Sequence, residues 1–166
     1  MGRDKARLPF RGGHLAGSVA ASVARAAGNV TLVGHAVLPG IPDCYPGEGP
    51  LGAILTALRH TQSDWNLIVA CDMPEVSAAF LDELLERAGR SRALVVLPYG
   101  PDGLPQPLCA AYHRHALGAL EEAFAGGARR VTAVLAGLPV EPFVVAELSH
   151  FQNVNTPQDW DAYAAK

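Results

Sequence analysis

The stretch "LIVACDMPE", from Leu67 to Glu75, ends an apolar run on an aspartate with no polar transition. The run predicts a buried strand over residues 66–72. Asp72 would then lie at the carboxyl end of that strand, where open parallel sheets bind their ligands. A carboxylate in that position is costly unless it is paired, hydrogen-bonded or bound to a metal. Two interpretations stay open: Asp72 is a Mg²⁺ ligand that bridges to substrate phosphates, or it caps a helix or turn, which Met73-Pro74 would also suit.

Apolar runs and helical segments alternate on both sides of this strand. Further strands are expected at residues 30–34, 93–98, 107–113 and 140–146. Helices are expected at residues 15–27, 53–61, 77–89, 115–127, 131–138 and 156–165. In the helix over residues 77–89, Ser77 is the expected cap and Gly89 the expected stop. Unbroken apolar strands separated by helices predict one α/β domain over residues 1–166, with a mostly parallel sheet and helices on both faces.

Composition and charge exclude several classes of protein. The chain has 166 residues, of which 49% are hydrophobic and 17% charged, and this suits a compact enzyme better than a disordered chain. Its net charge of −3 provides no basic surface for a nucleic acid or a membrane. We therefore expect neither of these as a partner, although one local site can still bind a single nucleotide.

The cysteines and the N-terminal residues indicate the cellular compartment of the protein. The three cysteines form no CxxC motif, and Cys71 and Cys109 lie in apolar runs, which favours buried thiols in a reducing cytoplasm. The start "MGRDKARLPF" has charges where a signal peptide has its apolar region, and no run approaches the roughly 18 apolar residues of a membrane span. A cytoplasmic location is expected.

Three further features suit a phosphorylated ligand, and each has an alternative explanation. Lys5 is one of only two lysines among the 13 basic residues, and a compact ammonium suits a phosphate oxygen, but Lys5 is equally explained as an ordinary surface residue. The glycines of "PGEGPLGA" (residues 46–53) let the backbone approach a ligand just before a helix, or form an ordinary loop. Asn153 and Asn155 of "NVNTP" offer amide groups to a polar ligand, or Asn155 caps the last helix.

Several common catalytic centres are not supported. No GxxxxGK[ST] phosphate loop and no GxSxG motif occurs. The histidines are scattered, and His113 and His115 lack the i, i+4 spacing of a helical zinc site. These patterns argue against a P-loop enzyme, a serine hydrolase and a metal–histidine centre.

Taken in order, the motifs resemble a known family. "MGRDKARLPF", "DCYPGEGPLGAI", "VACDMP", "PQPLCAAYHR", "GARRV" and "NVNTP" occur in the order found in molybdenum cofactor guanylyltransferases. The resemblance runs from Met1 to about Tyr163. It implies a Rossmann-like nucleotidyltransferase fold. The implied reaction transfers GMP from GTP to molybdopterin-bound molybdenum, forming the guanine dinucleotide cofactor and releasing pyrophosphate.

The resemblance also implies roles for residues. Lys5 matches a phosphate-binding lysine, Asp72 matches the Mg²⁺-binding aspartate, and both are the implied catalytic residues. Asn153 and Asn155 match a segment on the pterin side of the cleft. The implied nucleotide-binding residues are Lys5, Asp43, Gly49, Pro50, Leu51 and Asp72. Molybdopterin or the molybdenum cofactor is the implied partner, together with other cofactor-biosynthesis proteins and molybdoenzymes.

The chain departs from the family in two places. Members begin with a strand and a glycine-rich loop of the type LAGGxSxRMG, and this chain starts at what would be the last Met-Gly of that loop. We therefore expect an N-terminally truncated domain in which Met1 is an internal methionine. Gly34 stands where some members have an asparagine in the nucleotide site. Two alternatives stay open: a cytidylyltransferase acting on the same cofactor, and a degenerate chain that binds nucleotide or pterin without catalysis.

Overall fold

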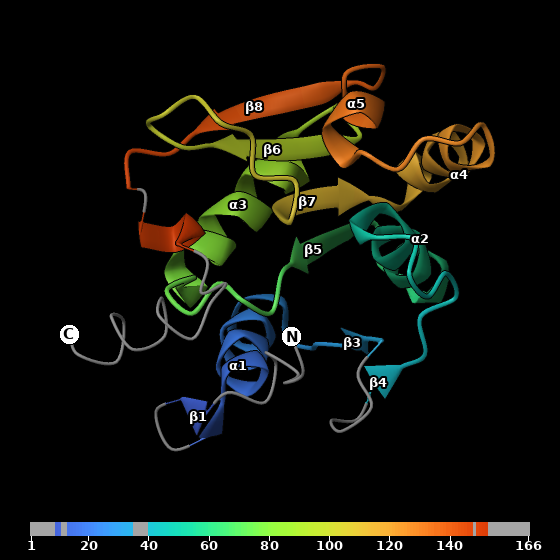
Figure 1. Cartoon of the computed structure of the whole chain (residues 1–166). Coiled ribbons are helices and arrows are strands. Elements are labelled where there is room, and N and C mark those ends of the chain that lie inside the picture. The colour runs from blue at the N-terminus through green and yellow to red at the C-terminus, as the bar shows by residue number, and fades with distance from the viewer. Residues whose placement is uncertain (1–8, 11–12, 35–39, 148, 153–166) are drawn as a thin grey trace.

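The computed structural model describes residues 9–10, 13–34, 40–147 and 149–152. Its helices, seen as coils in Figure 1, are α1 (Leu15–Ala27), α2 (Pro50–His60), α3 (Ala78–Arg90), α4 (Leu117–Ala125) and α5 (Val131–Leu135), with the 3₁₀ turns η2 (Arg114–Ala116) and η3 (Ser149–Phe151). Its strands are β1 (Pro9–Phe10), β2 (Gly13–His14), β3 (Leu32–Val33), β4 (Gly40–Ile41), β5 (Trp65–Val69), β6 (Val95–Tyr99), β7 (Cys109–His113) and β8 (Val140–Val144). The helix expected at residues 156–165 lies outside this described part.

The main sheet has the strand order β5-β7-β6-β8. Strand β7 is antiparallel to both β5 and β6, whereas β6 and β8 are parallel, so β5, β6 and β8 share one direction. The expected α/β class is confirmed, but the expectation of a mostly parallel sheet is wrong: the sheet is mixed, because the reversed strand β7 makes two of its three strand pairings antiparallel. The reversal follows from the short connection over residues 100–108, because a parallel return needs a crossover of a dozen or more residues, as a rule through a helix.

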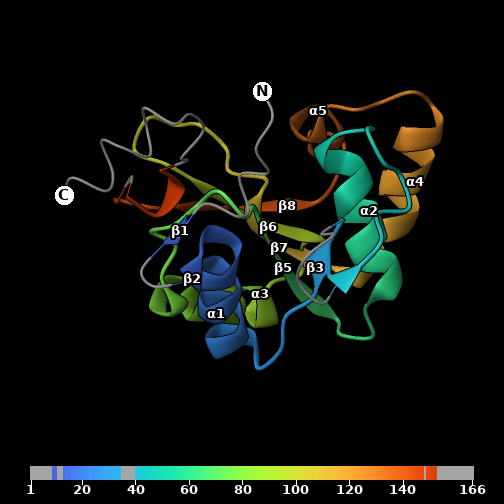
Figure 2. The same ribbon diagram turned by 60° about the horizontal axis from the view of Figure 1, so that its bottom comes forward.

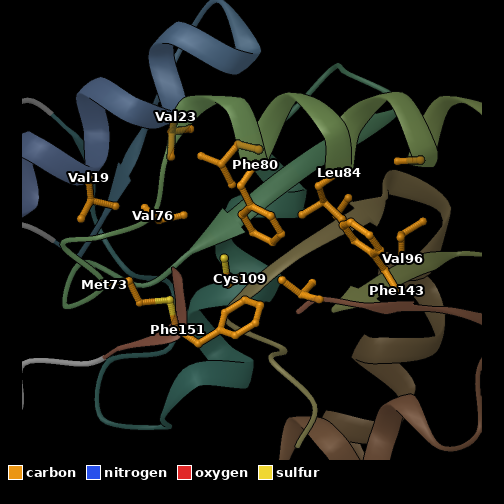
Figure 3. Close-up of a cluster of buried hydrophobic side chains, with 14 residues drawn as sticks. Val19, Val23, Met73, Val76, Phe80, Leu84, Val96, Cys109, Phe143 and Phe151 are labelled. Carbon is orange, nitrogen blue, oxygen red and sulfur yellow. The ribbon is translucent and has the colours of Figure 1, made fainter. Parts of the chain in front are cut away.

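Both faces of this sheet are covered by helices, as expected. Along β6, Val96 packs with α1 and α3, while Val95 and Leu97 pack with α2, α4 and α5. Along β7, Cys109 faces the first group of helices and Tyr112 the second. This period-two alternation divides the interior into two cores. Figure 3 shows the first of them, where side chains of α1 and α3 meet those of the sheet.

Helix α3 is bounded nearly as expected. The Ser77 hydroxyl accepts a hydrogen bond from the backbone N–H of Phe80 at 3.2 Å, so the predicted cap is confirmed. The predicted stop is wrong, because the helix runs through Gly89 and ends at Arg90. A glycine only weakens a helix interior, and here the chain turns extended one residue after Arg90, at Ser91.

None of the three cysteines forms a disulfide, and their burial differs. Cys109 is fully buried, and burial raises the pKa of its thiol to about 12. Cys71 is half-buried and Cys44 exposed, so the expectation of buried thiols is confirmed fully only for Cys109. Among the described helices, none is long and apolar enough to cross a membrane.

Candidate functional site

Asp72 lies in the turn between β5 and α3. The expected strand over residues 66–72 is shorter, because β5 ends at Val69 and the chain turns at Cys71 and Asp72. Asp72 does not cap α3, since Ser77 holds that position. Its Oδ1 atom is buried and, within the described residues, has no hydrogen-bond partner. A buried carboxylate oxygen left in this state is destabilising, which is a common signature of a ligand-binding group.

The glycine-rich loop before α2 lies at the same edge of the sheet. Helix α2 begins at Pro50, and Gly47 and Gly49 have φ angles of 83° and 79°, which favour glycine. Because a short connection joins α2 to β5, the first turn of α2 lies beside the carboxyl end of that strand. Gly47, Gly49 and Pro50 line the same cavity as Ala70 and Cys71, next to Asp72. The loop and the residues that lead from β5 to Asp72 thus line one cavity, although Asp72 itself is not among the lining residues.

Asp43 holds the base of this loop. Its Oδ1 atom accepts a hydrogen bond from the backbone N–H of Tyr45 at 2.9 Å and lies 2.9 Å from the hydroxyl of Thr56. The Thr56 hydroxyl, fully buried, also accepts from the backbone N–H of Cys44 at 3.0 Å. Asp43 lines the cavity as well. It therefore has a structural role in the loop, and its role in nucleotide binding stays a prediction.

A close approach between this loop and α2 requires a glycine. A Cβ atom on Gly52 would lie 2.8 Å from the Cβ atom of Tyr45 and 3.2 Å from its carbonyl oxygen. Gly52→Ala should therefore displace the loop and lower the free energy of unfolding by about 1–3 kcal/mol, measured by urea denaturation. Gly89→Ala in α3 is the control, since a Cβ there meets nothing within 4 Å and should be neutral or stabilising. Equal effects of the two substitutions would contradict the close approach.

A groove separates the main sheet from the small parallel pair β3–β4. It has a volume of about 1020 Å³ and is lined by small and apolar side chains of α1, α2, β3 and β5, together with polar residues such as Asp43, Gln62 and Asn66. Strand β5 pairs with β7 on one edge, and in the described part no strand covers its other edge. All five residues of β5 are consequently half-buried, where the sequence predicted a buried strand. Figure 2 shows β3 and β5 between α1 and α2, with no other described strand between the two.

Several predicted site residues fall outside the described part. These are Lys5, Asn153 and Asn155, whose roles stay predictions. In the ranges that the structure does describe, no group of three or more His, Cys, Asp or Glu residues could hold a metal ion. A protein-only metal cage is therefore not present there. The single buried carboxylate oxygen of Asp72 fits Mg²⁺ instead, because Mg²⁺ is commonly held by one or two carboxylates together with substrate phosphates and water.

Sequence reasoning missed two residues that shape the site. Thr56 lies in a predicted helix, and a threonine among inward-facing apolar residues indicates a buried hydrogen bond. Arg129 lies in the motif "GARRV", and that motif by itself indicates no role for it. It contacts Glu48 of the glycine-rich loop, 81 positions away in the chain, and no local pattern predicts such a contact.

The chain is similar to known nucleotidyltransferases. A family model described as the MobA-like NTP transferase domain matches residues 1–141. A probable molybdenum cofactor guanylyltransferase of Deinococcus radiodurans is 34% identical over 167 residues, covering 96% of this chain and 84% of the relative. One of Flavobacterium johnsoniae is 29% identical over 121 residues, covering 72% of this chain and 63% of the relative. The chain therefore spans less than two thirds of the length of the Flavobacterium relative.

A solved structure agrees with the fold. The crystal structure of molybdopterin-guanine dinucleotide biosynthesis protein A from Archaeoglobus fulgidus superimposes with a TM-score of 0.81 at 26% identity, covering 97% of this chain and 89% of that one. The Rossmann-like nucleotidyltransferase fold implied by the motifs is thereby confirmed.

Proposed function

The chain belongs to the family of MobA-like NTP transferase domains, and we propose that it transfers GMP from GTP to molybdopterin-bound molybdenum, releasing pyrophosphate. One observation supports the proposal: at the carboxyl end of β5, Ala70 and Cys71 line one cavity with Gly47, Gly49 and Pro50 of the glycine-rich loop, and the next residue along the chain is Asp72, whose buried Oδ1 atom has no hydrogen-bond partner among the described residues. This is where α/β sheets bind nucleotides. The names of the relatives from Deinococcus and Archaeoglobus support the choice of substrates.

Asp72 would hold Mg²⁺. When bound, the ion neutralises charge shared between phosphate oxygens during transfer. Mg²⁺ would satisfy the buried Oδ1 atom, which has no other partner among the described residues. The remaining ligands would come from substrate phosphates and water, in keeping with the preferences of this ion.

The chain's own groups would bind and orient the phosphates. The loop at Gly49, Pro50 and Leu51 offers backbone close to the nucleotide, with the positive end of the α2 dipole directly behind it. Lys5 would bind a phosphate oxygen, and Asp43 would keep the loop in place. Asn153 and Asn155 would lie on the pterin side. Molybdopterin is the expected second substrate, with other cofactor-biosynthesis proteins and molybdoenzymes as partners in a reducing cytoplasm.

The proposed step needs no strong general base. An oxygen of the terminal phosphate of molybdopterin, already a dianion, attacks the α-phosphorus of GTP. The bond from that phosphorus to the bridging oxygen breaks, and pyrophosphate leaves with the electron pair. Positioning and charge stabilisation therefore supply most of the catalysis. A base such as a histidine or a thiolate is not required.

We expect GTP to be preferred over CTP and ATP. Molybdopterin-dependent pyrophosphate release should be measured with each nucleotide, on the 166-residue chain and on a form lengthened ahead of Met1 by a strand and a loop of the LAGGxSxRMG type, called here the lengthened chain. GTP should give the fastest release. Faster pyrophosphate release with CTP would show that the chain is a cytidylyltransferase instead. If neither form releases pyrophosphate with any nucleotide, the chain is a degenerate protein that binds its ligand without catalysis.

A further inference from the structure

The segment after α4 makes a cluster of contacts with the glycine-rich loop before α2. The Nε atom of Arg129 donates to Oε2 of Glu48 at 2.5 Å. Its Nη1 atom donates to the carbonyl oxygens of Phe124 at 3.0 Å and Ala128 at 2.8 Å. One guanidinium group thus ties a loop side chain to the backbone at the end of α4. The two helices that carry these segments, α2 and α4, lie side by side in both views (Figures 1 and 2).

Aromatic rings extend the cluster toward the loop. The Arg129 guanidinium carbon lies 4.0 Å from the centre of the Phe124 ring, and the Phe124 and Tyr45 rings are 4.8 Å apart at their centres. Tyr45 in turn packs against Gly52 so closely that a Cβ atom there would collide with it. The loop over residues 45–49 is therefore held at both ends, by Tyr45 on Phe124 and by Glu48 on Arg129.

We propose that Arg129 is a positioning residue: through Glu48 and Phe124 it holds the glycine-rich loop, before any ligand binds, in the conformation that receives the nucleotide phosphates. The proposal rests on the proposed function for the identity of the ligand. The loop itself carries Gly47 and Gly49, both at positive φ, and a loop of this kind is flexible unless other contacts fix it.

The chemistry of Arg129 suits positioning. Its planar guanidinium group can bind a carboxylate, two carbonyl oxygens and the face of an aromatic ring at the same time. The compact ammonium of a lysine cannot do this. Its ion pair is half-exposed, with 43% of the Arg129 side chain and 44% of the Glu48 side chain accessible to solvent. Pairs of this exposure contribute little to global stability, so the consequence of losing it is expected in the local order of the loop.

The chain contains a matched control cluster away from the loop. Arg87 of α3 donates to Glu141 of β8 at 2.8 Å and lies 5.0 Å from the centre of the Phe143 ring. The exposed side-chain fractions, 46% for Arg87 and 32% for Glu141, are close to those of the first cluster. Arg87→Ala removes an ion pair and a cation–ring contact like those of Arg129, without the two backbone hydrogen bonds that Arg129 also makes, and it leaves the loop contacts intact.

Hydrogen exchange on the 166-residue chain provides the first test. In Arg129→Ala, amides in residues 43–52 should exchange roughly three- to tenfold faster than in the parent chain, because local opening becomes easier. Glu48→Gln should act in the same direction, and adding it to Arg129→Ala should add little. Arg87→Ala should leave this segment unchanged. If the amides of residues 43–52 exchange no faster in Arg129→Ala than in Arg87→Ala, the proposal is overturned. This result does not depend on whether the chain binds GTP.

Steady-state kinetics on the lengthened chain provide the second test. Arg129→Ala should raise the KM for GTP roughly three- to tenfold and leave kcat within about twofold, because only part of the free protein then has a competent loop. A large fall in kcat at unchanged KM would overturn the positioning role, since it would place Arg129 at the reacting atoms. If the parent lengthened chain turns over no GTP, the proposed function fails and the exchange experiment alone decides on Arg129.

Discussion

Asp72→Asn is expected to lower turnover by on the order of 10²-fold or more without lowering stability. The loss of turnover follows from the role proposed for this carboxylate, which would hold the ion that stabilises the transferring charge. Stability should be unchanged or higher, because the buried Oδ1 atom has no hydrogen bond to lose within the described residues. The measurements are GTP-dependent pyrophosphate release by the lengthened chain and urea denaturation.

Asp82→Asn is the control for this experiment, since Asp82 is an exposed residue of α3. Asp82→Asn should change neither the rate of pyrophosphate release nor the stability in urea. Unchanged turnover in Asp72→Asn would remove Asp72 from the reaction. A large loss of stability would indicate instead that the carboxylate holds the turn between β5 and α3.

The second large effect concerns the groove beside β5. Among the described residues no strand pairs with the free edge of β5, which exposes unpaired backbone groups and borders a cavity of about 1020 Å³. The lengthened chain supplies a strand for this groove and a glycine-rich loop whose N–H groups can bind phosphates. We expect the 166-residue chain to be poorly stable and close to inactive, and the lengthened chain to bind GTP.

GTP-dependent shifts in Tm compare the two forms, because a ligand that binds only the folded state raises Tm. The lengthened chain should also have the higher Tm without ligand. A matched extension with proline at alternate positions of the strand provides the control, since proline cannot complete a strand ladder. If the 166-residue chain is stable and binds GTP as tightly as the lengthened one, the groove is not the place of a missing strand.

Much of the fold follows from local sequence signals. The helix over residues 15–27 has the predicted bounds, and the Ser77 cap forms as expected, because apolar periodicity and capping depend on neighbouring residues. The direction of β7 was not predictable from its own residues. A buried strand has the same apolar pattern in either direction, and the short connection over residues 100–108 decides the outcome.

The candidate site was predictable only in part. The ordered motifs predicted a role for Asp72 and for the glycine-rich loop, because each of the two lies within its own short, continuous motif. The half-burial of β5 depends on which element lies across its free edge. The sequence of β5 alone does not show that. The contact between Glu48 and Arg129 joins segments 81 positions apart, and only the packing of α2 on α4 brings them together.

The fate of labelled phosphates tests the central claim most directly. The lengthened chain should be incubated with molybdopterin-bound molybdenum, Mg²⁺ and GTP labelled at either the α- or the γ-phosphate, and the products separated. Attack at the α-phosphorus predicts that the α-label enters the pterin product, with the mass of a guanine dinucleotide, while the γ-label leaves in pyrophosphate. Transfer of the γ-label to the pterin, or no label in any pterin product, would contradict the account.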